Sequence, residues 1–303
     1  MNHVLQEVPG APGSALVLQV HRAGDTAVLA RVRLRPAVGR PVPRFWFHVG
    51  CTVHASPSLG LFHRQRTLQL GNDHTGASEL VLEAGATGDA TETATALQLA
   101  LQGALLVLAD RRALFAARLI AELPGLRDGT GDSPAQSPFW QGLVRHFHTG
   151  DPLDAQRRLG EDWRAGVAAL LPRHLIYTAF LPPSAQAAIA QVHATALQQR
   201  EALEEAGLRY GHHVTIDEAG PVLEAETDGL PAVATSRATS VADTPAAPGA
   251  TPHWVLAGEP AQARVARVPL SLQDGLAALP EAAQRLLGTG PGQPVRVLPA
   301  RGG

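Results

Sequence analysis

The sequence contains no lysine: all 25 basic side chains among its 303 residues are arginines. Schiff-base enzymes, pyridoxal-phosphate enzymes and P-loop nucleotide-binding proteins each depend on a lysine amine, so these three classes are excluded. Alanine is abundant as well, so the use of arginine alone indicates a compositional bias rather than a functional adaptation.

Cysteine is almost absent. The single residue, Cys51, excludes an internal disulfide and a zinc site built from several thiolates. Because Cys51 lies in an apolar run that resembles a strand, we expect its thiol to be buried and inert.

Neither charge nor hydropathy indicates a nucleic-acid or membrane partner. The net charge is -2 and no basic face stands out, which disfavours nucleic acids and anionic membranes as partners. The longest apolar runs fall short of the ~20 residues that cross a bilayer. Residues Met1–Gly10 lack the basic-then-apolar pattern of a signal peptide. Together these absences predict a cytoplasmic protein.

Composition divides the chain into four parts. Residues 1–13 are rich in proline and glycine and predict a loose N-terminus. A mixed α/β domain is expected over residues 14–230, followed by an Ala/Pro/Thr-rich linker over 231–252. Residues 253–303 predict a small β-rich module.

Within the main domain, several helices and strands are predicted by periodicity and by caps. Residues Thr91–Arg112 carry leucines at helical spacing, and Ser137 followed by Pro138 is a typical helix start. Residues 184–206 read as one continuous helix, and residues 209–217 and 221–225 as a closing pair of strands.

The polar run between Val49 and Leu80 is the most informative part of the sequence. It holds two histidine-bearing clusters, V-G-C-T-V-H-A-S and L-G-N-D-H-T-G-A-S-E-L, on what we predict to be neighbouring strands. A hydrophobic core does not need the consecutive polar residues Asn72 to Thr75. Taken alone, however, these residues are most simply interpreted as a polar β-turn, which Asn and Asp favour.

Four segments resemble the bacterial arginine N-succinyltransferase family in order and spacing. The first comprises both clusters just quoted; the others are S-P-F-W-Q from Ser137, Leu171–His193, and Leu203–Glu224. Together they cover most of the span between residues 45 and 226. The C-terminal module also looks like the terminal β region of that family.

The resemblance implies a fold and an activity. The fold is an α/β (α+β) GNAT-type acyl-CoA N-acyltransferase, with a mixed sheet that splays at its centre and is flanked by helices. Relative to the family, the chain looks N-terminally shortened. The implied reaction transfers succinyl from succinyl-CoA to the α-amine of L-arginine, in bacterial arginine catabolism. Succinyl-CoA is then a co-substrate, no cofactor is bound permanently, and a homo-oligomer or a hetero-oligomer with a paralogous subunit is expected.

The reaction requires a base, donors for an oxyanion and an acid for the leaving thiolate. The family's proton donor is a histidine after a Q-V motif, which corresponds here to His193. Histidine suits either proton role near neutral pH. The alternative is a histidine on the surface of a continuous helix, because Ala194 stands where the family usually has a helix-breaking proline.

The resemblance also implies where the two substrates bind. Asp73 and Glu79 suit the guanidinium of arginine, because a fork-shaped cation favours carboxylates. The full set expected on the acceptor side is His54, Ser56, Asn72, Asp73, His74, Ser78 and Glu79. The backbone contact with acyl-CoA falls at Leu82 or Glu83.

Two departures from the family concern CoA. The family's glycine-rich phosphate loop is replaced by a stretch from Ala90 to Thr95 that has no glycine or arginine and contains Glu92. The family's A-E-x-R-G becomes Ala121–Gly125 and loses a basic residue. A non-catalytic or regulatory subunit with a degenerate CoA site is therefore the alternative function.

No metal site is expected, although the chain has 13 histidines. His146 and His148 are two apart on a predicted helix, and His212 and His213 are adjacent on a predicted strand, so each pair points in different directions.

Overall fold

The computed structural model describes residues 3–8, 15–86, 89–129, 131, 133–244, 246 and 249–300. Its strands are β1 (His3–Val8), β2 (Leu16–Arg22), β3 (Ala30–Arg35), β4 (Trp46–Ser56), β5 (Leu61–Gly71), β6 (Ser78–Ala84), β7 (Arg118–Glu122), β8 (Ile176–Tyr177), β9 (Arg209–Thr215), β10 (Pro221–Glu226), β11 (Arg237–Ser240), β12 (Thr251–Ala257), β13 (Arg264–Gln273), β14 (Leu276–Ala278) and β15 (Pro294–Pro299). Its α-helices are α1 (Ala90–Asp110), α2 (Pro138–Gly142), α3 (Pro152–Leu159), α4 (Trp163–Ala168), α5 (Pro183–Ala188), α6 (Leu197–Glu205), α7 (Pro231–Thr235) and α8 (Glu281–Leu287).

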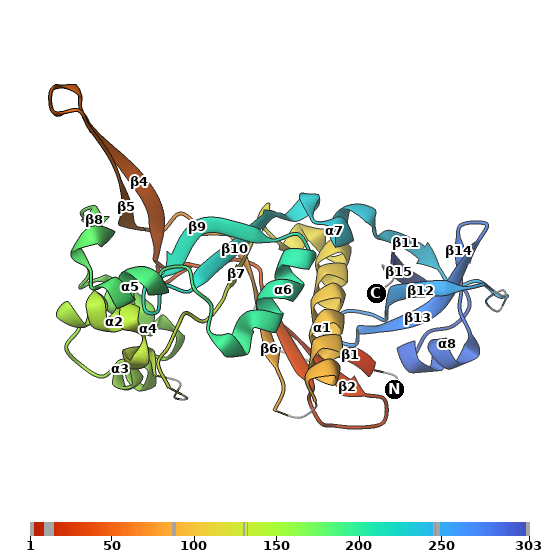
Figure 1. Cartoon of the computed structure of the whole chain (residues 1–303). Coiled ribbons are helices and arrows are strands. Elements are labelled where there is room, and N and C mark those ends of the chain that lie inside the picture. Colours follow the sequence, from red (N-terminus) through yellow and green to blue (C-terminus); the bar gives the residue numbers. More distant parts are fainter. Residues whose placement is uncertain are drawn as a thin grey trace.

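All these strands belong to one sheet (Figure 1). Its order is β11-β15-β12-β13-β1-β2-β3-β6-β7-β10-β9-β4-β5-β8, with β14 paired to β13. The strands of the C-terminal segment therefore continue the sheet of the main domain through the pairing of β13 with β1.

The sheet splits at its centre. There β6 and β7, which are joined through α1, run parallel and pair only at Ser78 with Leu119 and at Glu79 with Ile120. Beyond Glu79, β6 continues along β3 as far as Ala84. The mixed, splayed sheet flanked by helices that the family resemblance implied is thus confirmed.

Helix α1 forms the centre of the largest hydrophobic core. Asp89 caps its start, and buried leucines and alanines along its length pack against β2, β3 and β6. By length and composition alone this 21-residue helix could also cross a membrane, contrary to the expectation that no apolar run is long enough, but it lies largely buried against the sheet.

The other face of the central strands is polar. Along β3, Val32 and Leu34 point into the α1 core, whereas Arg33 and Arg35 alternate with them and point to the opposite face. Beside this polar face, α2, α4 and α5 pack with β4, β5 and β9 in a second core. The predicted start of α2 is confirmed, because the Ser137 hydroxyl accepts a hydrogen bond from the Phe139 backbone N–H with Pro138 at the first helical position.

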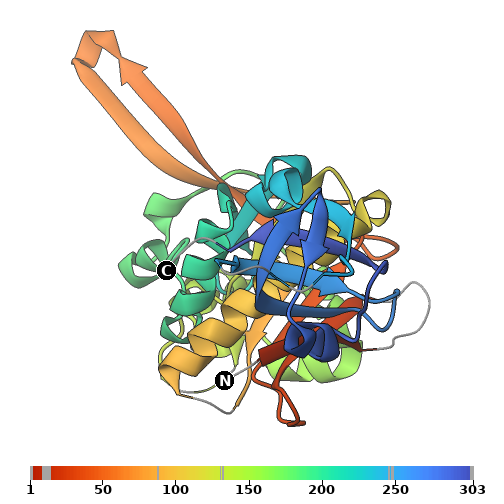
Figure 2. The ribbon, with the colours of Figure 1, turned by 90° about the vertical axis from the view of Figure 1, so that its right-hand side faces the viewer.

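Strands β4 and β5 extend beyond the sheet as a long hairpin arm (Figures 1 and 2). β4 pairs with β9 only from Trp46 to His48, and its remaining residues pair with β5 alone. Cys51 lies on this arm and is exposed. The expectation of a buried thiol is wrong, because no other element covers the arm at that point.

Two segments that we expected to be irregular contain regular structure. His3–Val8, in the N-terminal segment expected to be loose, forms β1 because both of its edges find partners, in β2 and β13. Residues 9–13 of that segment lie outside the described residues. In the segment expected as a linker, α7 packs against α1, and β11 pairs with β15.

Candidate active site

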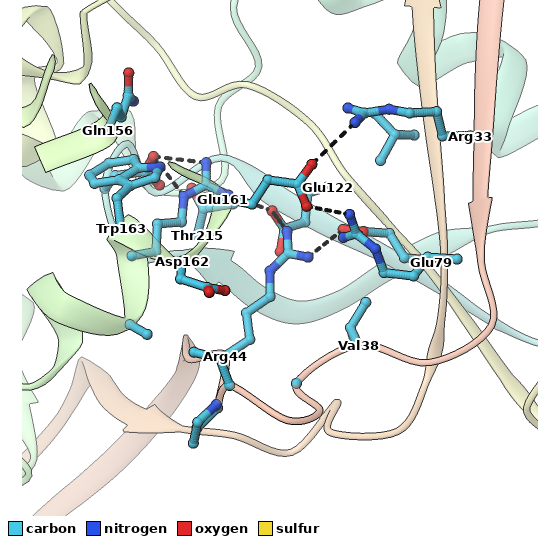
Figure 3. A pocket seen from close by; sticks show the side chains of 18 of the residues that line it. Arg33, Val38, Arg44, Glu79, Glu122, Gln156, Glu161, Asp162, Trp163 and Thr215 are labelled. Atoms are coloured by element: carbon cyan, nitrogen blue, oxygen red, sulfur yellow. Dashed lines mark hydrogen bonds and ion pairs between the residues drawn. The ribbon is translucent and has the colours of Figure 1, made fainter. Parts of the chain in front are cut away.

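A cavity of about 580 Å³ opens on the polar face of the sheet, beside the split between β6 and β7 (Figure 3). Residues of β3, β6, α4, the 37–44 loop and the ends of β7 and β9 line it. Its charged lining residues include Arg35, Arg44, Glu79, Glu122, Arg164, Asp217 and Glu218.

A network of ion pairs crosses one wall of this cavity. The Glu122 carboxylate accepts hydrogen bonds from the Trp46 indole (2.6 Å) and Arg164 (2.9 Å), and it pairs with Arg44 (2.7 Å). Arg164 also donates to Asp217 at 2.8 Å. Burial tends to raise the pKa of Glu122, but the charges of Arg44 and Arg164 outweigh it and lower that pKa to about 2. Glu122 is therefore fixed as an anion.

Glu79, one of the residues expected on the acceptor side, lines the cavity. Its buried carboxylate is paired with Arg35 and with Arg44, each at 2.7 Å. The carboxylate that we expected to bind the guanidinium of a substrate is thus already paired with two arginines of this chain. Glu79 orders the wall of the cavity in this structure.

Glu218 differs from the other cavity carboxylates. It is buried, and one oxygen accepts a hydrogen bond from the Gly125 backbone N–H at 3.0 Å. Burial and the neighbouring charge of Asp217 raise the pKa of Glu218 to about 7, against the opposing charges of Arg127 and Arg164. A carboxyl group that titrates near neutrality suits a general acid or base. The sequence analysis missed it, because a Glu after a strand carries no local signal of its burial.

His193 lies near the same point of the fold. Its backbone N–H donates to the Pro124 carbonyl at 3.0 Å, and the adjacent Val192 bridges to Gly125. The end of β7 thus has Glu218 on one side and His193 on the other. His193 is not among the described residues that line the cavity. It begins the turn that leads into α6, beside α1.

The continuous helix considered for residues 184–206 is absent. Helix α5 ends at Ala188, and Ala190 adopts a positive φ of 64° while its N–H donates to the Ala219 carbonyl. The pairing with the end of β7 breaks the helix before His193. The Thr195 backbone N–H and hydroxyl lie 3.4 and 2.8 Å from the Nδ1 atom of His193. Because the N–H can only donate, Nδ1 accepts and the ring proton lies on Nε2.

The remaining residues expected on the acceptor side are dispersed. Asn72, Asp73 and His74 lie in the turn between β5 and β6 and do not line the cavity. Ser78 is buried, donates to the Pro36 carbonyl and accepts from the Ala116 N–H, so it joins two backbone segments.

His54 and Ser56 lie far from that turn, near the tip of the hairpin arm. Six residues of extended strand separate His54 from His48, the last residue of β4 paired to β9, which corresponds to about 20 Å. Within one chain the two polar clusters therefore lie apart, because β4 leaves the sheet between them.

The two residues expected to contact acyl-CoA lie on β6 where it diverges from β7. Leu82 packs toward the α1 core, and Glu83 points to the opposite face and pairs with Arg33 at 3.1 Å.

The N-terminus of α1 is occupied by side chains of this chain. Asp89 accepts a hydrogen bond from the Glu92 backbone N–H at 2.8 Å. The Glu92 carboxylate is in turn bonded to Arg22 at 2.7 Å and to His3 at 3.3 Å. Glu92 is thus neutralised in part, but Asp89 leaves negative charge at the helix end where a phosphate would be favoured.

Three comparisons relate this chain to known proteins. The family model described as arginine N-succinyltransferase beta subunit matches residues 6–232. Curated proteins named arginine N-succinyltransferase from Salmonella paratyphi B and Salmonella enteritidis are 35% identical over 259 residues, which is 84% of this chain and 72% of theirs. The structure of arginine/ornithine succinyltransferase subunit AI from Pseudomonas aeruginosa superposes with a TM-score of 0.77 and 25% identity, covering 96% of this chain and 83% of that one.

Proposed function

The chain belongs to the arginine N-succinyltransferase family, and we propose that it transfers the succinyl group of succinyl-CoA to the α-amine of L-arginine. The observation in this chain that most supports the chemistry is Glu218, a buried carboxyl group with a pKa raised to about 7 beside the split in the sheet. The acceptor amine enters from the cavity, and acyl-CoA lies on the α1 side.

Glu218 is the base in this proposal. It takes one proton from the substrate ammonium, and the free amine attacks the thioester carbonyl carbon. A C–N bond forms and the carbonyl oxygen becomes an oxyanion, for which the proposed donors are backbone N–H groups of β6 near Leu82 and Glu83. The raised pKa of Glu218 matches the task, because a base that titrates near neutrality is both ionised and able to accept a proton.

His193 is the acid. When the intermediate collapses, the C–S bond breaks and the thiolate of CoA takes a proton from Nε2 of His193, which donates as an imidazolium so that the ring returns to its neutral form. The second proton of the substrate ammonium charges the ring beforehand, and Nδ1–H of the charged ring donates to the Thr195 hydroxyl at 2.8 Å. In the balance, the ammonium loses two protons: one is offset by the proton that sulfur receives, and the other passes to solvent. The products are N2-succinyl-arginine and CoA.

Thiol release from succinyl-CoA and L-arginine tests these roles. His193→Ala and Glu218→Gln are each expected to lower turnover by roughly 10²- to 10⁴-fold, the usual contribution of acid-base catalysis. His212→Asn and Glu205→Gln, at exposed positions, are the matched controls and should leave turnover unchanged. A variant of either site residue with native turnover would remove that residue from the mechanism.

The second candidate function is a supporting subunit that does not bind CoA. Asp89 and Glu92 at the start of α1 favour it, because they occupy the helix end that binds pyrophosphate in a typical acyl-CoA site. In the same assay, a supporting subunit would be silent alone and would stimulate its co-encoded paralogue. The Pseudomonas relative is itself named as a subunit, which supports an oligomer of two related chains. We propose that this oligomer is cytoplasmic.

A further inference from the structure

A second polar cluster lies outside the cavity, where the turn before β6 meets β9 and β10. It consists of His74 from the turn, His213 from β9 and Glu224 from β10. One ligand atom of each lies within 4.8 Å of the others, and Nδ1 of His74 is 3.8 Å from Oε2 of Glu224. None of the three lines the cavity described above.

His74 is buried with unused bonding capacity. Its side chain is inaccessible to solvent, and neither ring nitrogen has a hydrogen-bond partner in the described part of the chain. Oε2 of Glu224 is likewise buried without a hydrogen-bond donor. Buried polar atoms are almost always paired, so the unpaired ring nitrogens of His74 beside the unpaired Oε2 of Glu224 indicate that a bonding partner is missing at this point.

His213 is oriented as a metal ligand. Its Nδ1 lies 2.9 Å from the Gly211 carbonyl, which can only accept, so Nδ1 carries a proton. In the neutral ring, Nε2 then presents a lone pair, and it faces Oδ2 of Asp73 at 3.2 Å. This contact can be bridged by a proton on Nε2 or by a metal ion bonded to both atoms, and only the metal ion would also engage His74 and Glu224. A backbone carbonyl that fixes the tautomer through the second ring nitrogen is the usual support of a metal-bound histidine.

We propose that His74, His213 and Glu224 bind a divalent transition-metal ion, for which Zn²⁺ is the best fit. Two imidazoles and one carboxylate are a common zinc ligand set, and tetrahedral zinc ligands lie about 3.4 Å apart, given bonds of about 2.0–2.1 Å. Rotation of the half-buried Glu224 side chain closes the remaining separation. Asp73, whose side chain is 60% exposed, stands at the open side and supplies the fourth ligand.

The ion would join segments that are far apart in the sequence. It would hold the turn before β6 against β9, the strand that leads into Asp217 and Glu218 of the cavity. The competing cation is Arg118, whose guanidinium is 3.7 Å from Oε2 of Glu224 and half-exposed. Displacement of this weakly placed arginine is the rearrangement that metal binding requires.

Calorimetric titration of the chelator-treated full chain with ZnCl₂ tests the site. One Zn²⁺ per chain should bind to the native protein. Glu224→Gln keeps the side-chain shape and should weaken binding at least about tenfold, and His213→Gln should weaken it further. His212→Asn is the matched control, because His212 is adjacent, exposed and at a positive φ that Asn tolerates. This control should bind as the native chain does.

Titration with CoCl₂ gives an independent readout. The native chain should develop the intense visible bands of tetrahedral cobalt, and Glu224→Gln should lose them. Circular dichroism in the presence of chelator checks that each variant folds. If His213→Gln does not fold, the comparison of Glu224→Gln with the native chain decides the test. Lack of saturable binding by the native chain, or equal zinc affinity in Glu224→Gln and His212→Asn, would overturn the proposal.

Discussion

Two buried polar clusters lie along β9 and the turn that follows it, and they deal with their charges in opposite ways. Around the cavity, Glu122 and Asp217 share the guanidinium of Arg164, and Arg44 adds a further positive charge. Around His74, three acceptor side chains face one another, with no cation bonded to His74 itself among the described residues.

The difference teaches what each cluster can do. Opposite charges that are mutually bonded are locked in one ionisation state and define the shape of the cavity wall. Neutral imidazoles beside carboxylates remain able to bind a cation. Glu218 is the carboxyl group of the cavity that is not held as an anion in this way. Burial and the charge of Asp217 raise the pKa of Glu218 to about 7.

Arg164→Met would break the paired cluster and has the largest expected effect on stability. It leaves Glu122 and Asp217 as buried anions with one partner fewer, which costs about 3 kcal/mol or more. Urea denaturation at pH 7 measures the loss. Arg158→Ala, on the exposed side of α3, is the control and should change stability by less than about 0.5 kcal/mol. Equal stability of the two variants would mean that the network does not stabilise the fold.

The titration of Glu218 should make the stability contributed by the cavity cluster depend on pH. Its pKa is near 4.5 in an unfolded chain and about 7 in the folded one, so the folded state favours the protonated form. Its contribution is therefore complete below pH 4.5 and is lost as the pH rises through 7, by about 3 kcal/mol. The free energy of unfolding of the native chain, minus that of Glu218→Gln, should fall over this window.

The same group should control activity in the opposite direction. As the base ionises, kcat/KM of the native chain should rise with pH through about 7, and this limb should vanish in Glu218→Gln. If the pH profile of kcat/KM has no inflection near pH 7, the ionisation of Glu218 does not control catalysis.

His74→Leu has the smallest expected effect at neutral pH. Removing an imidazole whose nitrogens are unpaired should change the stability of the metal-free chain by less than about 1 kcal/mol at pH 7. At lower pH the sign is reversed relative to Glu218: the pKa of His74 is lowered from 6.5 to about 4, so the native chain loses stability relative to the variant as the pH falls through this range. Urea denaturation in chelator at pH 7 and pH 5 measures both. A loss above 3 kcal/mol at pH 7 would show that the ring is paired in solution.

Much of the fold could be predicted from local sequence. The leucine spacing of α1 and the Ser137-Pro138 start of α2 depend on neighbouring residues only, and both are confirmed. The break before His193 could not be predicted, since it depends on the pairing of Val192 with Gly125. The position of the hairpin arm depends likewise on where β9 stops pairing with β4.

The site residues divide in the same way. Glu79 and His193 were both expected from recognisable motifs; Glu79 lines the cavity, and His193 does not. Glu218 carries none, because its raised pKa comes from burial and from Asp217. The cluster of His74, His213 and Glu224 escaped a search for paired histidines, since its members are far apart along the chain. They meet only through the register of β9 with β10 and the turn before β6.

Motifs, periodicity and composition are local properties, and they were enough to identify the family, helix α1 and the start of α2, and to exclude lysine chemistry. Only the tertiary structure decided which carboxyl group titrates near neutrality, which predicted residues lie apart, and where unpaired histidines gather. Those outcomes depend on desolvation and on through-space charge, which are set by residues distant in the chain.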